Sequence, residues 1–84
     1  MAWKTCEVTW AGPTETGGIF IALKATDGSF ERWFQAFPGM QKEMLATALC
    51  AMSTGMRVEA ALPDSLQEYG VIERLYVRQW VPPA

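Results

Sequence analysis

The sequence predicts a mainly β fold with one helix, for three reasons. Residues 40–54, MQKEMLATALCAMST, are the only long segment whose apolar residues recur with helical spacing. The segments before and after it alternate between apolar and polar residues, as half-buried strands do. The chain has 84 residues, which is enough for one domain spanning 1–84 and too few for two.

The predicted helix has clear start and stop signals. Pro38 and Gly39 interrupt the chain before it. Glu43 falls in the first turn, where the helix dipole favours an acidic side chain, and Gly55 stands where a left-handed C-terminal cap is expected. A core-facing stripe is predicted from the spacing i, i+3, i+4 and i+7 of Leu45, Ala48, Leu49 and Met52.

Met44 and Ala51 lie on one flank of this stripe, next to Ala48, and widen it. The apolar arc is then broader than one face of a small domain needs, and the alanines would let another backbone come close. We predict that these three residues meet a neighbouring subunit. The alternative is that a loop of the same chain covers them.

Five segments have strand-like patterns, at 4–10, 19–25, 30–37, 56–62 and 71–80. In the first, alternation places Cys6, Val8 and Trp10 on one side. The second is apolar on both faces, which predicts a strand covered on both sides. Asp27–Gly28 is a strong hairpin signal between the second and third segments.

Three strands, a helix and two more strands are the element order of the OB-fold, a small partly open barrel. We therefore predict a five-stranded OB-like barrel with one helix at about 40–54. An open sheet with a single helix packed across it is the alternative. The barrel is preferred because two aromatic-rich faces are easier to bury in a closed or paired sheet.

Composition bears on the possible partners. The chain is 50% hydrophobic and 12% aromatic, so some apolar side chains are expected outside so small a core, where self-association would cover them. Charged residues make up 19% and the net charge is −2. Without a cluster of Lys and Arg, nucleic-acid binding by phosphate neutralisation is disfavoured.

The segment from Lys42 to Val77 resembles a known family. The helix KEMLATALCAMSTG, the strand MRVEAAL and the segment EYGVIERLYV follow one another as in the small OB-fold B subunits of AB5-type toxins of bacteria, particularly the subtilase-cytotoxin and pertussis-like group. The resemblance implies a ring of subunits, commonly a pentamer, with helices toward the centre and glycan contacts from outer strands and loops. The sequence departs from the family in lacking a secretory leader and the cysteine spacing of a secreted disulfide.

Catalytic and metal-binding motifs are missing from the sequence. It contains no His, which removes the usual general base and the commonest metal ligand. Cys6 and Cys50 are too far apart for a zinc knuckle and are expected as buried thiols. We therefore predict no cofactor, no metal and no enzymatic activity. The charged pairs are expected to be exposed cross-strand ion pairs: Glu31 with Arg32, Arg57 with Glu59, and Glu73 with Arg74.

Aromatic residues are the remaining candidates for a site. Tryptophan or tyrosine beside a charged side chain is typical of platforms on which sugars or bases stack. The best patch combines Trp33 and Arg32 with Tyr76 and either Arg74 or Arg78. A glycan or small amphipathic molecule is favoured over single-stranded nucleic acid because the chain is acidic. Core packing or a subunit contact is the alternative role for these aromatics.

Together these observations predict a small non-catalytic binding module that assembles with copies of itself. One alternative is a structural or protein-interaction protein without a small ligand. Another is an OB domain that binds single-stranded nucleic acid. The sequence shows no signal peptide and no apolar run long enough to span a membrane, which predicts a cytoplasmic protein, or a secreted one if a leader has been removed.

Overall fold

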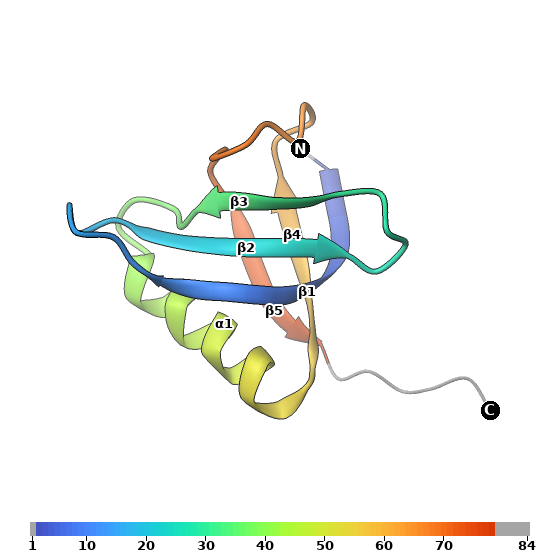
Figure 1. The fold of residues 1–84 in the computed structure, drawn as a ribbon, viewed down its shortest axis with the longest axis horizontal. Helices are drawn as coiled ribbons and strands as arrows, with labels where there is room; N and C mark the ends of the chain where they lie inside the picture. The colour runs from blue at the N-terminus through green and yellow to red at the C-terminus, as the bar shows by residue number, and fades with distance from the viewer. Residues whose placement is uncertain (1, 79–84) are drawn as a thin grey trace.

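The computed structural model describes residues 2–78, which form five strands and one helix in the predicted order (Figure 1). The elements are β1 (Ala2–Pro13), β2 (Ile19–Ala25), β3 (Glu31–Gln35), α1 (Gln41–Thr54), β4 (Arg57–Leu62) and β5 (Arg74–Arg78). The prediction of a mainly β chain with one helix is confirmed.

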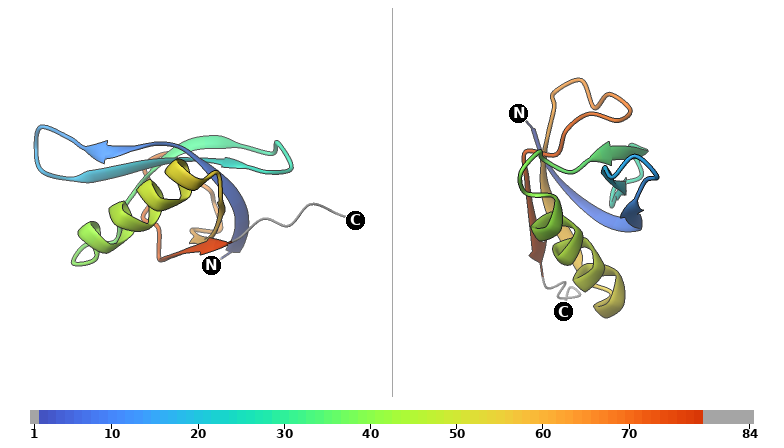
Figure 2. Two further views of the ribbon diagram at one scale, coloured as in Figure 1. Left: turned by 90° about the horizontal axis from the view of Figure 1, so that it is seen from below. Right: turned by 90° about the vertical axis from the view of Figure 1, so that its left-hand side faces the viewer.

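All five strands belong to one antiparallel sheet with the order β3-β2-β1-β4-β5. The long strand β1 pairs with β4 through its first half and with β2 through its second half. The sheet bends along β1, so that β4 and β5 cross behind β2 and β3 (Figure 1). Helix α1 packs in the angle between the two halves of the sheet (Figure 2).

The edge strands β3 and β5 are not regular neighbours, so the strand pairing is that of an open sheet and does not close a barrel. The chain just before β5 nevertheless touches the end of β3. Gln35 and Val71 form an isolated parallel bridge. The N–H of Ile72 donates to the carbonyl of Gln35 at 2.8 Å, and the N–H of Gln35 donates to the carbonyl of Gly70 at 2.9 Å.

The largest differences from the predicted strand boundaries within the described residues are at the end of β1 and the start of β5. β1 continues to Pro13, where its register pairs it with Ile19 across a short turn. β5 begins at Arg74 because the chain bonds to β3 at Ile72 and reaches β4 only at Glu73, whose N–H donates to the carbonyl of Ala61. The predicted end of the last strand, at 79–80, lies outside the described residues.

The turn signals read from the sequence are confirmed. Gly28 has φ 80° in the hairpin between β2 and β3, and the Asp27 carboxylate accepts the N–H of Ser29 at 2.9 Å. Gly55 ends α1 in the left-handed conformation with φ 71°, donating its N–H to the carbonyl of Ala51. Glycine is favoured at both positions because a side chain would strain a positive φ.

The predicted core face of α1 is right at Ala48 and wrong at Leu49 and Met52. The helix buries Met44, Ala48 and Ala51 against the chain's own sheet, whereas Leu49 and Met52 are exposed by 48% and 43%. These three buried residues are therefore core residues, and the prediction that they form a subunit interface is corrected. Small alanines let the helix approach the curved sheet closely, and the larger apolar residues remain outside.

The core lies between α1 and the inner face of the sheet. Its largest fully buried side chains are Phe34, Ile21, Leu23, Leu62, Ile72, Val58 and Cys6. Cys6 is buried as predicted, but Cys50 is exposed on the outer side of α1. Within residues 2–78 no helix is long and apolar enough to cross a membrane.

Candidate functional site: an aromatic cleft on the outer sheet face

A β-bulge decides where Trp10 points. Val8 pairs with Leu23 but Trp10 pairs with Ala22, so Thr9 is one extra residue in β1. Simple alternation predicts Trp10 beside Cys6 and Val8, on the core side of the strand. The extra residue reverses this, and Trp10 lies on the outer face, 64% exposed.

Trp10 then belongs to a row of three residues across β1, β2 and β3. Trp10 and Trp33 both pair with Ala22, one from each side. The two indole rings lie 6.2 Å apart, centroid to centroid, with their planes inclined by 37°. Ala22 lies between them and is only 3% exposed. Its small methyl group leaves room for both rings to converge over it. The second apolar face predicted for β2 is confirmed, and these rings cover it.

A second aromatic pair stands beside this row. Phe20 lies two residues before Ala22 and therefore projects from the same face of β2. Its ring is 5.4 Å from that of Tyr69, which comes from the loop between β4 and β5. Aromatic side chains from three strands and one loop thus meet on the outer face of the sheet.

The loop that carries Tyr69, residues 63–70, is bonded to the free edge of β3 and is called the strap below. The N–H of Tyr69 donates to the carbonyl of Trp33 at 2.7 Å, and the Gln35 side chain donates to the carbonyl of Tyr69 at 2.9 Å. The N–H of Trp33 in turn donates to the Glu68 carboxylate at 3.0 Å. These bonds satisfy an edge strand that would otherwise offer unpaired groups.

The strap contains local backbone strain. Leu66 and Tyr69 have φ values of 50° and 62°, a region that residues with side chains rarely occupy. The Arg32 guanidinium donates to the carbonyl of Leu66, which helps to hold this conformation. Strain of this kind persists only where the surroundings fix it, and it is common around binding sites.

Two adjoining hollows result from this arrangement. The larger, of about 510 Å³, is called the aromatic cleft and is lined by Trp10, Ala11, Gly12, Pro13, Thr14, Phe20, Trp33 and Tyr69. The smaller, of about 330 Å³, is called the polar hollow and is lined by Thr9, Trp10, Ala22, Glu31, Arg32 and Trp33. Their volumes fall in the range of small-molecule sites. Trp10 and Trp33 line both, so the two hollows meet at these rings.

The predicted ligand patch is divided between two surfaces. Trp33 lines both the aromatic cleft and the polar hollow, and Arg32 lines the polar hollow. Arg74, Tyr76 and Arg78 lie instead on β5, at the other end of the strand order. The sequence could not show this because the bend along β1 separates the outer faces of the two half-sheets.

Tyr76 belongs to a different aromatic pair. Its ring stacks on Trp3 at 5.9 Å, with planes inclined by 15°. Trp3 pairs with Ala61 on β4, and this alanine is fully buried although it faces outward. The Trp3–Tyr76 pair therefore covers a small residue, as the Trp10–Trp33 pair does, but none of its residues lines the aromatic cleft.

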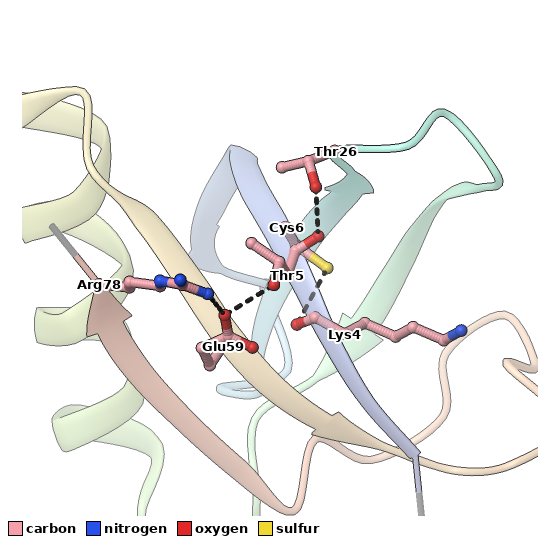
Figure 3. Close-up of polar contacts among 6 residues, drawn as sticks. All are labelled: Lys4, Thr5, Cys6, Thr26, Glu59 and Arg78. Carbon is pink, nitrogen blue, oxygen red and sulfur yellow. Dashed lines mark hydrogen bonds and ion pairs between the residues drawn. The ribbon is translucent and has the colours of Figure 1, made fainter. Parts of the chain in front are cut away.

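Charged side chains around Tyr76 are engaged with one another. Figure 3 shows that the Glu59 carboxylate accepts hydrogen bonds from Thr5, at 2.6 Å, and from Arg78. The Thr5 hydroxyl and the Arg78 guanidinium hold the pKa of Glu59 below its usual value, although partial burial opposes them. Arg57 pairs with Glu7 at 3.8 Å. The predicted pairing of Arg57 with Glu59 is therefore corrected, because both residues find partners on neighbouring strands.

The two thiols, Cys6 and Cys50, do not line the cleft. Cys6 is in the core, where burial, with smaller contributions from Glu59 and Asp27, raises the pKa of its thiol to about 12. In the part of the chain that the structure describes, no three acidic or Cys side chains gather to hold a metal ion.

Three aromatic residues of the cleft were not predicted from the sequence as site residues, namely Trp10, Phe20 and Tyr69. The apolar second face of β2 was a usable signal for Phe20, but a one-residue bulge and a strained loop leave no clear mark in a sequence. The cleft can hold a flat apolar surface against its aromatic rings, beside polar groups at its margin.

The chain matches no protein family, no curated protein and no solved structure in comparisons with known proteins.

Proposed function

We propose that this chain is a non-catalytic binding module whose ligand occupies the aromatic cleft. The observation that carries the proposal is the Trp10–Trp33 pair, which forms because the β-bulge turns Trp10 to the outer face, where Trp33 lies. The core is complete without these rings, since Phe34 and its neighbours fill it. Large exposed aromatic rings beside a hollow of this volume are the usual construction of a stacking site.

A glycan fits the cleft better than a nucleic acid does. Sugar rings present apolar C–H faces to aromatic rings and hydroxyl groups to polar side chains at the margin. Glu31 lines the adjoining polar hollow and Glu68 is bonded to Trp33, so carboxylates stand where a phosphate backbone would need cations. A small amphipathic molecule has the same two kinds of surface and is the second choice.

The test is a binding screen followed by substitutions. The protein is applied to a printed glycan array, and hits are titrated by tryptophan fluorescence. Trp33→Ala should weaken binding by about 1–3 kcal/mol, the contribution of one stacking ring. Trp3→Ala removes an equally large ring from the other surface and serves as the control. Equal losses in both variants, or binding unaffected by Trp33→Ala, would place the ligand elsewhere.

We also propose that the fold is an OB-like barrel whose closure is made by loop contacts in place of regular strand pairing. The strand order, with the helix between the third and fourth strands, supports this. The parallel bridge between Gln35 and Val71 supports it further, because it lies between the two edge strands that a barrel must join. An experimental structure in which Gln35 and Val71 are separated would contradict it.

Self-association is the remaining part of the proposal. The exposed apolar residues of α1 are Leu49 and Met52, with Met40 just before the helix. A second copy of the chain would cover them, as the resemblance to the ring-forming B subunits of AB5-type toxins suggests. Light scattering should show an oligomer that Leu49→Gln with Met52→Gln dissociates. A monomer at micromolar concentration would remove this part and leave the cleft unaffected.

A further inference from the structure

The polar hollow differs in chemistry from the aromatic cleft that it adjoins. Thr9, Glu31 and Arg32 are its polar lining residues, and Glu31 lies on the same face of β3 as Trp33. The Arg32 guanidinium already donates to the carbonyl of Leu66. Among residues 2–78 the Glu31 carboxylate has no hydrogen-bond or ion-pair partner, so it is free to accept from a ligand.

Both hollows lie along one strand of the same sheet face. Glu31 is at the polar end of β3, Trp33 is at the junction, and Gln35, paired with Phe20, is at the aromatic end. Four residues of extended strand span about 13 Å. A ligand that touches Glu31 and also stacks near Phe20 and Tyr69 is therefore longer than one sugar ring.

From this geometry we propose that the site binds an uncharged oligosaccharide of at least two units, one in each hollow. The inference rests on the proposed function. One unit stacks in the aromatic cleft against Trp33 and Tyr69. The next passes the Trp10–Trp33 pair and presents its hydroxyl groups to the Glu31 carboxylate, which accepts hydrogen bonds from them.

Charge excludes acidic ligands from this arrangement. Glu31 and Arg32 carry opposite charges in the same hollow, so the hollow offers no excess of positive charge to an anion. Glu68, held against the N–H of Trp33, adds a second carboxylate nearby. An acidic sugar, a phosphate group or a nucleic-acid backbone would meet repulsion from both carboxylates.

The experiment uses the printed array of neutral and acidic glycans and then the fragments of its strongest neutral glycan. Titration calorimetry measures the affinity for the mono-, di- and tetrasaccharide. The disaccharide should bind at least about tenfold more tightly than the monosaccharide, because its second unit forms hydrogen bonds with the charged Glu31. The tetrasaccharide should bind little more tightly than the disaccharide. Glu31→Ala should remove about tenfold from disaccharide binding and leave monosaccharide binding within about twofold. Glu73→Ala, an exposed acidic residue that lines neither hollow, is the matched control.

The outcomes separate the two claims. A monosaccharide that binds as tightly as the disaccharide, a Glu31→Ala protein that binds the disaccharide normally, or preference for acidic glycans overturns the two-unit site. Each of these leaves the aromatic cleft in place if Trp33→Ala still weakens binding and Trp3→Ala does not. No binding to any glycan on the array would contradict both the two-unit site and the glycan part of the proposed function.

Discussion

Thr9 has more influence on this surface than its size suggests. As the extra residue of the bulge, it reverses the side of β1 to which Trp10 belongs. Its own hydroxyl makes only a long contact of 3.4 Å with the carbonyl of Ala22. Inserting one residue into a strand can thus move a neighbouring side chain from the core to the surface, whatever the inserted residue's own side chain contributes.

The Thr5–Glu59–Arg78 cluster is the residue-scale source of pH dependence. The pKa of Glu59 is lowered in the folded chain, so its contribution to the free energy of unfolding is present at neutral pH and is lost as the pH falls through the folded pKa. Thr5→Val removes the hydroxyl whose hydrogen bond is the largest single cause of the lowered Glu59 pKa. We expect a loss of about 1 kcal/mol at pH 7, a raised Glu59 pKa, and a difference from the parent protein that narrows in acid.

The measurements are urea unfolding at neutral and acidic pH and an NMR titration of the Glu59 carboxyl. Thr16→Val is the control, because the Thr16 hydroxyl contacts only Thr14 at 2.9 Å in the exposed turn. An unchanged Glu59 pKa in Thr5→Val would show that Arg78 alone holds the carboxylate.

The two thiols should differ in reactivity. Cys6 is fully buried and its pKa is raised to about 12, while Cys50 is exposed. Near pH 8 the folded protein should react with one equivalent of a disulfide reagent, at Cys50, since the thiolate is the reactive form. Peptide mass spectrometry identifies the labelled site. Labelling of Cys6 at the same rate would mean that the core opens readily, and both residues should react after unfolding in guanidinium chloride.

At the scale of elements, α1 shows how a helical pattern can fit two faces. The spacing of Leu45, Leu49 and Met52 fits a stripe as well as that of Met44, Ala48 and Ala51 does. Hydrophobicity favours the first, because leucine buries more apolar area than alanine. The second stripe is nevertheless the one that is buried, and Ala48 is fully covered where the helix packs on the curved sheet.

A pair of glutamine substitutions tests this helix face. Ala51→Gln places a larger polar side chain in the core and should cost about 2–4 kcal/mol of stability, from overpacking and an unsatisfied amide. Met52→Gln is nearly isosteric at an exposed position and should cost less than about 0.5 kcal/mol. Thermal or urea unfolding measures both. The reverse order of effects would restore the face predicted from the sequence.

For the whole molecule, the decisive feature is the contact between β3 and the chain before β5. The amides of Gln35 and Ile72 donate hydrogen bonds across this contact. If the contact opens only when the whole sheet unfolds, these two amides should exchange hydrogen as slowly as the amides of β1. Native-state hydrogen exchange followed by NMR measures this directly. Fast exchange at both amides, with slow exchange in β1, would show that the sheet stays open and would contradict the barrel proposal.

Much of the fold was accessible from local signals. The helix, the hairpin at Asp27–Gly28 and the cap at Gly55 depend on neighbouring residues only, and each was found. The aromatic content correctly indicated that large rings remain outside the core, as Trp3 and Trp10 do. Two of the five residues of the predicted ligand patch lie at the site, since Trp33 lines both hollows and Arg32 lines the polar hollow.

What the sequence by itself determined is the order and type of the elements, because backbone propensity, turn geometry and alternation act over a few residues. Only the tertiary structure decided which face of α1 is buried, which way Trp10 points, and that Tyr69 joins Phe20 while Tyr76 joins Trp3. These choices depend on how closely a helix can approach a bent sheet and on the register between strands far apart in the chain. No short-range pattern records either quantity.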